Sequence, residues 1–119
     1  MNINSFVYLD RIRPLVLALP ATTEGSCYGT PGFRVKKKLL ARLHEDGETL
    51  VVYTEDRETW ISAKPAVFYF TEHYRNSFYM LVRLKKVSNK DLAAVLLAAW
   101  RLRAPKLLLK EYAPGKKDK

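Results

Sequence analysis

The sequence has a single cysteine, Cys27, which excludes a disulfide within the chain and fits a reducing compartment. Long apolar runs are also missing. The longest, 92–100, has nine residues, whereas a membrane-spanning helix needs about 20. The apolar stretch 15–19 is short and lies between two prolines, so it does not resemble a signal peptide. We therefore expect a cytoplasmic protein with no membrane association.

Residues that carry catalysis or hold metals are scarce. The two histidines, His44 and His73, and Cys27 lack the spacing of a zinc site. There is no Gly-rich phosphate loop and no GxSxG motif. A thiol enzyme would need a histidine beside Cys27, and Glu24 is the other candidate for a hydrolase. We expect no enzyme activity, no metal and no other cofactor, with such a hydrolase as the minor alternative.

Charge, by contrast, is plentiful and uneven. The 119 residues include 21 Lys and Arg against 12 Asp and Glu, a formal net charge of +9. Residues 1–60 hold 8 of each sign, whereas residues 61–119 hold 13 basic and 4 acidic residues. A lopsided positive field attracts nucleic acid or other polyanions. The alternative is a solvated basic surface that binds nothing specific.

The N-terminal third begins with a helical pattern. Apolar residues recur at spacings of three and four from Phe6 to Leu19, which predicts an amphipathic helix that begins near Asn4 or Ser5. Pro14 lies inside this pattern, and we expect it to kink or split the helix.

The period then changes to two, which is typical of strands. We expect strands near 26–28, 33–35, 39–43, 50–53, 67–70 and 78–84, with a turn at Asp46-Gly47. Thr54 is expected to cap a short helix that ends at Ala63.

Two further helices are predicted at the C-terminal end. Ser88 to Asp91 form a capping box before a helix over 89–103, and Pro105 precedes a helix over 106–112. We expect Trp100 and Cys27 to be buried. The fold class is α+β: an antiparallel sheet of hairpins packed on N- and C-terminal helices in two layers. Residues 1–113 form one domain, and 114–119 form a basic flexible tail.

An ordered set of short motifs resembles the MmcQ/YjbR family and covers nearly the whole chain. The motifs are Leu17–Pro20, Thr23–Gly25, Tyr28-Gly29-x-Pro31-x-Phe33-Arg34-Val35, Phe68-Tyr69-x-Thr71-x-His73-Tyr74, Leu81–Leu84 and Ala99-Trp100-Arg101-Leu102-x-Ala104-Pro105-Lys106. The resemblance implies a compact CyaY-like, double-wing fold. It also implies DNA binding.

The candidate site residues form three groups. The first is the hairpin tip Lys36, Lys37 and Lys38 with the preceding Arg34, whose cations can track phosphates. The alternative role of these lysines is to protect a sheet edge from aggregation. The second group is His73, Tyr74 and Arg75 on one loop, which can stack a base or bind an anion, unless Tyr74 packs inward.

The third group is a C-terminal basic cluster, Arg101, Arg103, Lys106 and Lys110. Its alternative role is to cover the core with long aliphatic stems while the charges stay in water.

The sequence predicts a monomer or weak dimer that binds DNA or RNA through phosphates without base-specific readout. The alternative is a protein- or small-ligand-interaction module with incidental basic charge. A closed apolar pocket lined by Tyr28, Phe33, His73 and Tyr74 would favour that alternative.

Overall fold

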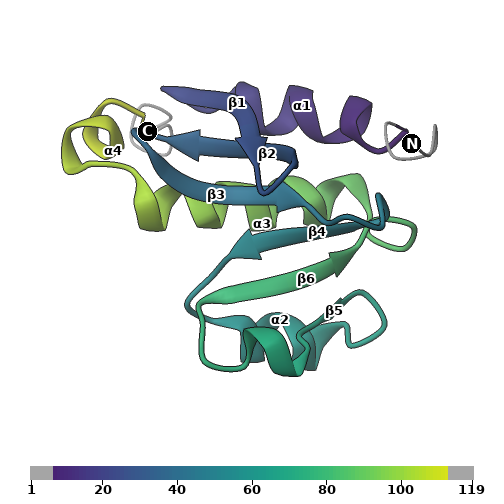
Figure 1. Cartoon of the computed structure of the whole chain (residues 1–119). Coiled ribbons are helices and arrows are strands. Elements are labelled where there is room, and N and C mark those ends of the chain that lie inside the picture. The colour runs from purple at the N-terminus through teal and green to yellow at the C-terminus, as the bar shows by residue number, and fades with distance from the viewer. Residues whose placement is uncertain (1–6, 113–119) are drawn as a thin grey trace.

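The computed structural model describes residues 7–112 and shows one six-stranded antiparallel sheet with helices packed on one face (Figure 1). The strands are β1 Thr22–Cys27, β2 Thr30–Val35, β3 Lys38–Leu43, β4 Thr49–Tyr53, β5 Phe68–Tyr69 and β6 Tyr79–Arg83. The helices are α1 Leu9–Leu17, α2 Arg57–Ala63, α3 Asn89–Arg103 and α4 Lys106–Tyr112, with a short 3-10 helix, η2, at Glu72–Tyr74. The α+β prediction is confirmed.

The strand order is β1-β2-β3-β4-β6-β5. Consecutive hairpins build the sheet as far as β4. The chain then passes through α2 to the far edge at β5, and β6 returns beside β4. In this register Leu50 lies opposite Val82, and Val52 lies opposite Met80. These pairs place apolar side chains on the face that α3 covers.

The sheet splits between β3 and β4, which only three residue pairs join, from Ala41 opposite Val52 to Leu43 opposite Leu50. The register between β2 and β3 shifts at Phe33, which leaves Leu40 as an extra residue on β3. Such bulges increase the local twist of a strand. In Figure 1 the first half of β3 accordingly diverges from the end of β4.

The core lies between the sheet and α3. Trp100 is the largest fully buried side chain. Its indole Nε1 donates to the Pro20 carbonyl at 2.9 Å, and its ring lies 4.9 Å from that of Tyr112 on α4. Trp100 therefore joins α3 to α4 and to the segment after α1. The predicted burial of Trp100 and Cys27 is confirmed.

Both C-terminal helices have the predicted bounds. Ser88 caps α3, since its Oγ accepts from the Asp91 amide at 3.1 Å. Of the two effects predicted for Pro14, a kink or a split, the split is wrong: α1 continues through Pro14. Pro14 and Asp10 are both exposed, so the Asp10 carbonyl that lacks a helical partner can reach water. The N-cap predicted at Asn4 or Ser5 and the tail 114–119 lie outside the described residues.

Other boundaries differ from those predicted. The first strand begins four residues earlier, at Thr22, and β5 is only the pair Phe68-Tyr69. Thr54 does not begin a helix: its amide donates to the Phe78 carbonyl at 2.7 Å and so extends the pairing of β4 with β6. Helix α2 therefore begins only at Arg57.

Candidate functional site

The β2–β3 turn presents the predicted lysine tip. Lys36 and Lys37 have φ angles of +49° and +75°, so both adopt the left-handed conformation of a two-residue hairpin turn. Lys38 opens β3 opposite Val35, and all three lysines are exposed. A left-handed residue other than glycine costs roughly 1 kcal/mol. The hairpin therefore carries lysines where asparagine and glycine would be more stable.

The C-terminal cations divide into two kinds. Arg101 on α3 and Lys106 and Lys110 on α4 are exposed. Arg103 is half-buried, with its guanidinium 4.1 Å from the centre of the Tyr53 ring. Its Nε is buried and has no hydrogen-bond partner among residues 7–112. Arg103 therefore packs against the sheet instead of extending a solvent-facing stripe.

The hairpin and the C-terminal helices lie toward the same end of the view in Figure 1. Burial raises the pKa of Tyr79, while the charges of Arg103 on α3 and Arg34 on β2 oppose the rise. The charges of both arginines thus act on the same tyrosine. In Figure 1 the β2–β3 turn and α4 share the left end of the view. We call six exposed residues there the basic end: Lys36, Lys37, Lys38, Arg101, Lys106 and Lys110.

The basic end is not neutralised by carboxylates in the described part of the chain. None of its six residues forms an ion pair within 7–112. Elsewhere, Arg13 pairs with Glu24 at 2.9 Å, and Lys85 pairs with Glu48 at 3.5 Å. Lys86 and Lys90 are likewise exposed and form no ion pair within 7–112, and Arg101 also borders the groove between α2 and α3 that Glu55 and Asp56 line. The basic end is therefore distinguished by the number of its unpaired cations.

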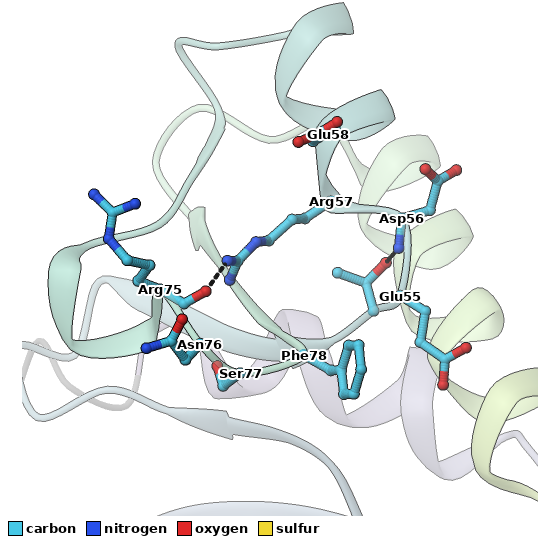
Figure 2. A pocket seen from close by; sticks show the side chains of 9 residues that line it. Glu55, Asp56, Arg57, Glu58, Arg75, Asn76, Ser77 and Phe78 are labelled. Atoms are coloured by element: carbon cyan, nitrogen blue, oxygen red, sulfur yellow. Dashed lines mark hydrogen bonds between the residues drawn. The ribbon is translucent and has the colours of Figure 1, made fainter.

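The predicted loop 73–75 is held by Arg57, a residue to which sequence analysis assigned no role (Figure 2). The Arg57 Nη1 donates to the carbonyls of Tyr74 and Tyr79 at 2.8 and 2.9 Å, and Nη2 donates to the carbonyl of Arg75. Its guanidinium also lies 3.9 Å from the centre of the Phe70 ring. Arg57 thus fixes the segment between η2 and β6.

The three residues of that loop separate in space. His73 and Tyr74 line a cleft on the face of the sheet that the helices leave open, their rings perpendicular and 4.8 Å apart. Arg75 instead pairs with Glu72 at 2.9 Å and borders the hollow beside Arg57 in Figure 2. The loop 73–75 and the basic end therefore border different parts of the surface.

The open-face cleft has a volume of about 550 Å³. Its lining residues come from the β1–β2 turn, three strands, the loop after β3 and η2: Tyr28, Leu39, Arg42, Glu45, Val51, His73, Tyr74 and Tyr79. Of the four residues whose pocket would favour a ligand-binding module, Tyr28, His73 and Tyr74 line this cleft and Phe33 does not. Phe33 is fully buried because its side chain points to the helix-covered face.

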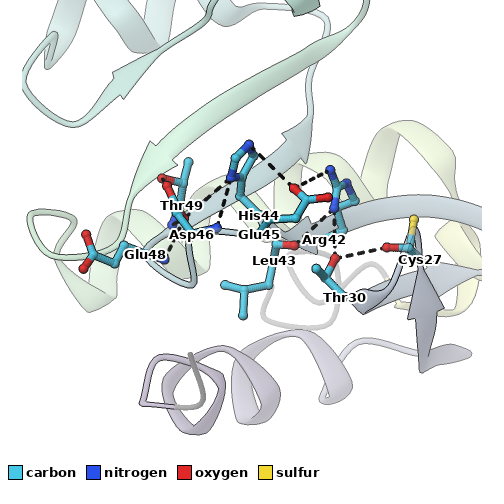
Figure 3. A network of polar contacts seen from close by, with 9 residues as sticks. All are labelled: Cys27, Thr30, Arg42, Leu43, His44, Glu45, Asp46, Glu48 and Thr49. Carbon is cyan, nitrogen blue, oxygen red and sulfur yellow. Dashed lines mark hydrogen bonds and ion pairs between the residues drawn. The ribbon is translucent and has the colours of Figure 1, made fainter. Parts of the chain in front are cut away.

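Arg42 is the buried charge of this cleft, and its side chain is 10% exposed. Nη1 donates to Thr30 Oγ1 at 2.9 Å and to the Leu43 carbonyl at 3.3 Å (Figure 3). Nη2 donates to Glu45 Oε1 at 3.4 Å. Burial lowers the pKa of Arg42, but the Tyr74 hydroxyl and the Glu45 carboxylate together raise it, so the guanidinium stays charged.

Sequence reasoning missed Arg42 because it reads as a solvent-facing position of an alternating strand. Cross-strand pairing places it opposite Gly32 and Val51, neither of which covers it with a long side chain. The β1–β2 turn does so instead, with the Tyr28 ring centre 5.5 Å from the guanidinium. Both features arise from strand pairing and from a distant turn, so no local signal in the sequence marked Arg42 as a site residue.

The turn between β3 and β4 gives a pH-dependent prediction. Asp46 accepts hydrogen bonds from the Glu48 and Thr49 amides at 2.8 and 2.9 Å, and from the Thr49 hydroxyl at 2.8 Å. Burial alone would raise the pKa of Asp46, but these hydrogen bonds lower it by a larger amount, so the net shift of the pKa is downward. A depressed folded pKa stabilises the fold above the unfolded pKa, and the effect is lost as pH falls through the folded value.

We therefore expect Asp46→Ala to lower stability by about 1 kcal/mol at neutral pH. The difference from the parent protein should shrink below about pH 4, the ordinary range of an aspartate. Urea unfolding at several pH values measures this. Asp46→Asn is the control, since it keeps an acceptor oxygen without the titration. A deficit for Asp46→Ala that is constant down to the lowest pH would contradict the prediction.

The two residues considered for hydrolysis have other surroundings. Cys27 is buried at the end of β1. Both carboxylate oxygens of Glu24 accept from Arg13 at 2.9 Å, which ties β1 to α1. Residues 7–112 contain no cluster of three or more His, Cys, Asp or Glu side chains suited to a metal. Within the same residues, no helix combines the length and apolar character needed to cross a bilayer.

The fold and its surfaces define a class: a single α+β unit whose antiparallel sheet is covered by helices on one face and open on the other. The family model YjbR matches residues 17–102, and the chain belongs to the YjbR family. A crystal structure of the Deinococcus radiodurans protein DR2400, with a DUF419 domain, has the same fold. The TM-score is 0.70 at 22% identity, over 87% of this chain and 86% of that one. No curated protein matches the sequence.

Proposed function

We propose that the protein binds nucleic acid through phosphate contacts at the basic end, without base-specific readout and without catalysis. The observation that carries the proposal is the gathering of six exposed cations on a hairpin turn and two helices, none of them in an ion pair within 7–112. Lysine and arginine at such sites replace the counterions of a phosphate backbone. The left-handed lysine turn supports the proposal, because its sequence is not the one that would best stabilise the hairpin.

The experiment measures the affinity of a fluorescently labelled DNA duplex by anisotropy at several salt concentrations. Each phosphate contact contributes about −0.9 to the slope of log K against log salt, so a slope of about −3 to −5 is expected. The same measurements with single-stranded DNA and RNA show which nucleic acid is preferred.

The decisive variant is Lys36→Asn, Lys37→Gly, Lys38→Gln. Asparagine and glycine suit the turn, so this variant removes three charges while the hairpin becomes more stable. We expect affinity to fall about tenfold and the slope to lose about 2 to 3 units.

A matched control removes three charges from the opposite end, with Lys85→Gln, Lys86→Gln and Lys90→Gln. Lys85 and Lys86 lie between β6 and α3, and Lys90 lies in the first turn of α3; in Figure 1 this part of the chain is on the right, away from the basic end. This control should keep most of the slope. Equal losses in both variants, or no binding near 50 mM salt, would refute a phosphate site at the basic end.

A further inference from the structure

The open-face cleft contains a buried cation whose counter-charge is weakly held. Charge-assisted hydrogen bonds are usually about 2.7–2.9 Å long. The Arg42 contact with Glu45 is 3.4 Å, and the Glu45 side chain is 59% exposed. The same carboxylate oxygen also lies 3.7 Å from His44 Nε2 (Figure 3). The Glu45 carboxylate is thus exposed and distant from Nη2, so another anion can compete with it for the guanidinium.

The walls of the cleft are aromatic. Tyr28 is 84% exposed and is held in the left-handed region, at φ +54°, with Arg42 beside its ring. Tyr74 and His73 stand perpendicular to each other on another side, and Val51 and Leu39 supply apolar surface. Exposed aromatic rings around an apolar floor suit a flat ring system.

The size and charge of the cleft distinguish it from the basic end. A volume of about 550 Å³ is that of a small-molecule site. It holds one guanidinium and no lysine, and none of the six basic-end residues lines it. One buried arginine matches one carboxylate or phosphate group, in contrast to the row of cations that tracks a polymer.

From this geometry we propose that the open-face cleft binds a small planar aromatic anion, with its acidic group on Arg42 and its ring against Tyr28 and Tyr74. The ligand's acidic group takes the place of the Glu45 carboxylate at Nη2. Binding here does not depend on the proposed nucleic-acid site, because the two sites share no residue.

The test uses indole-3-carboxylate as the probe, in calorimetry and in amide-resolved NMR titrations of the full chain. For a ligand of this size we expect Kd on the order of 0.1–1 mM, with shifts centred on Tyr28, Arg42 and Tyr74. Uncharged indole-3-carboxamide should bind about tenfold more weakly, since it loses the ionic contact. Phenyl phosphate in a parallel titration shows whether the site prefers a phosphate to a carboxylate.

Three variants make the test specific. Glu45→Gln removes the competing carboxylate and should bind the probe several-fold more tightly. Tyr28→Ala should bind it at least several-fold more weakly. Tyr69→Ala is the matched control, because Tyr69 also lies beside an arginine, 4.0 Å from the Arg83 guanidinium, but outside the cleft.

A weaker affinity in Glu45→Gln would overturn the exchange of acidic groups at Arg42. Equal binding of carboxylate and carboxamide would overturn the anion site itself. So would shifts centred on the groove between α2 and α3, which Trp60 and Leu97 line. The lysine variant Lys36→Asn, Lys37→Gly, Lys38→Gln should bind the probe as the parent does. The DNA measurements therefore test the proposed nucleic-acid site, and the probe titrations test the cleft independently of it.

Discussion

Replacing Trp100 with alanine is expected to cost the fold about 3–5 kcal/mol, the usual range for a fully buried aromatic side chain. The indole fills the space between the sheet and α3, and its ring packs against Tyr112. Its Nε1 also donates a hydrogen bond to the Pro20 carbonyl. Truncation removes these contacts and leaves a cavity that a close-packed core can only partly refill.

The measurement is urea unfolding followed by circular dichroism. Trp100→Phe is the control, because phenylalanine keeps much of the apolar volume but loses the Pro20 hydrogen bond and one ring of the indole. We expect it to cost roughly 1–2 kcal/mol. A loss below 1 kcal/mol for the alanine variant would mean that Trp100 does not hold the helix layer together.

Arg57→Met is expected to destabilise the protein by about 2–3 kcal/mol and to loosen one wall of the open-face cleft. The substitution leaves the carbonyls of Tyr74, Arg75 and Tyr79 without their donor. Hydrogen bonds to a charged group contribute about 1.5–3 kcal/mol each, but partial exposure lets water replace some of them. Methionine retains an apolar stem against Phe70, so packing changes least.

Hydrogen exchange separates the two effects. Amides of residues 72–78 should exchange much faster in Arg57→Met, while those of β2 and β3 change only with global stability. The control is Arg75→Met, which breaks only the exposed pair with Glu72 and should cost less than about 1 kcal/mol. Unchanged protection of residues 72–78 would show that Arg57 does not position that segment.

Local signals predicted the elements whose cause is local. Ser88 and the apolar run after it specified α3 to the residue, because a capping side chain and a continuous buried stripe act within one helix. Asp46-Gly47 marked its turn for the same reason, and the lysine tip was located correctly. The helix start predicted at Thr54 was wrong, because a threonine can either cap a helix or continue a strand. The hydrogen bond from its amide to the Phe78 carbonyl decides for the strand.

The cleft was only partly predictable because long-range pairing creates it. The pocket that would favour a ligand-binding module was named with Tyr28, His73 and Tyr74, which line the cleft, and with Phe33, which faces the helices. The β2–β3 register decides which strand residues face the helices, and the sequence does not display the bulge at Leu40 that shifts it. Arg42 and Arg57 acquire their roles only from turns that approach them from elsewhere in the chain.

The late position of α3 in the chain affects how the protein emerges from the ribosome. Every strand precedes α3, yet the apolar face that includes Leu50, Val52 and Met80 is covered only when that helix docks. During synthesis the finished hairpins therefore carry an uncovered apolar surface until residues beyond Trp100 have left the exit tunnel. Exposed surface of this kind recruits chaperones or aggregates. A stop codon before α3 should thus yield insoluble protein instead of a smaller folded domain.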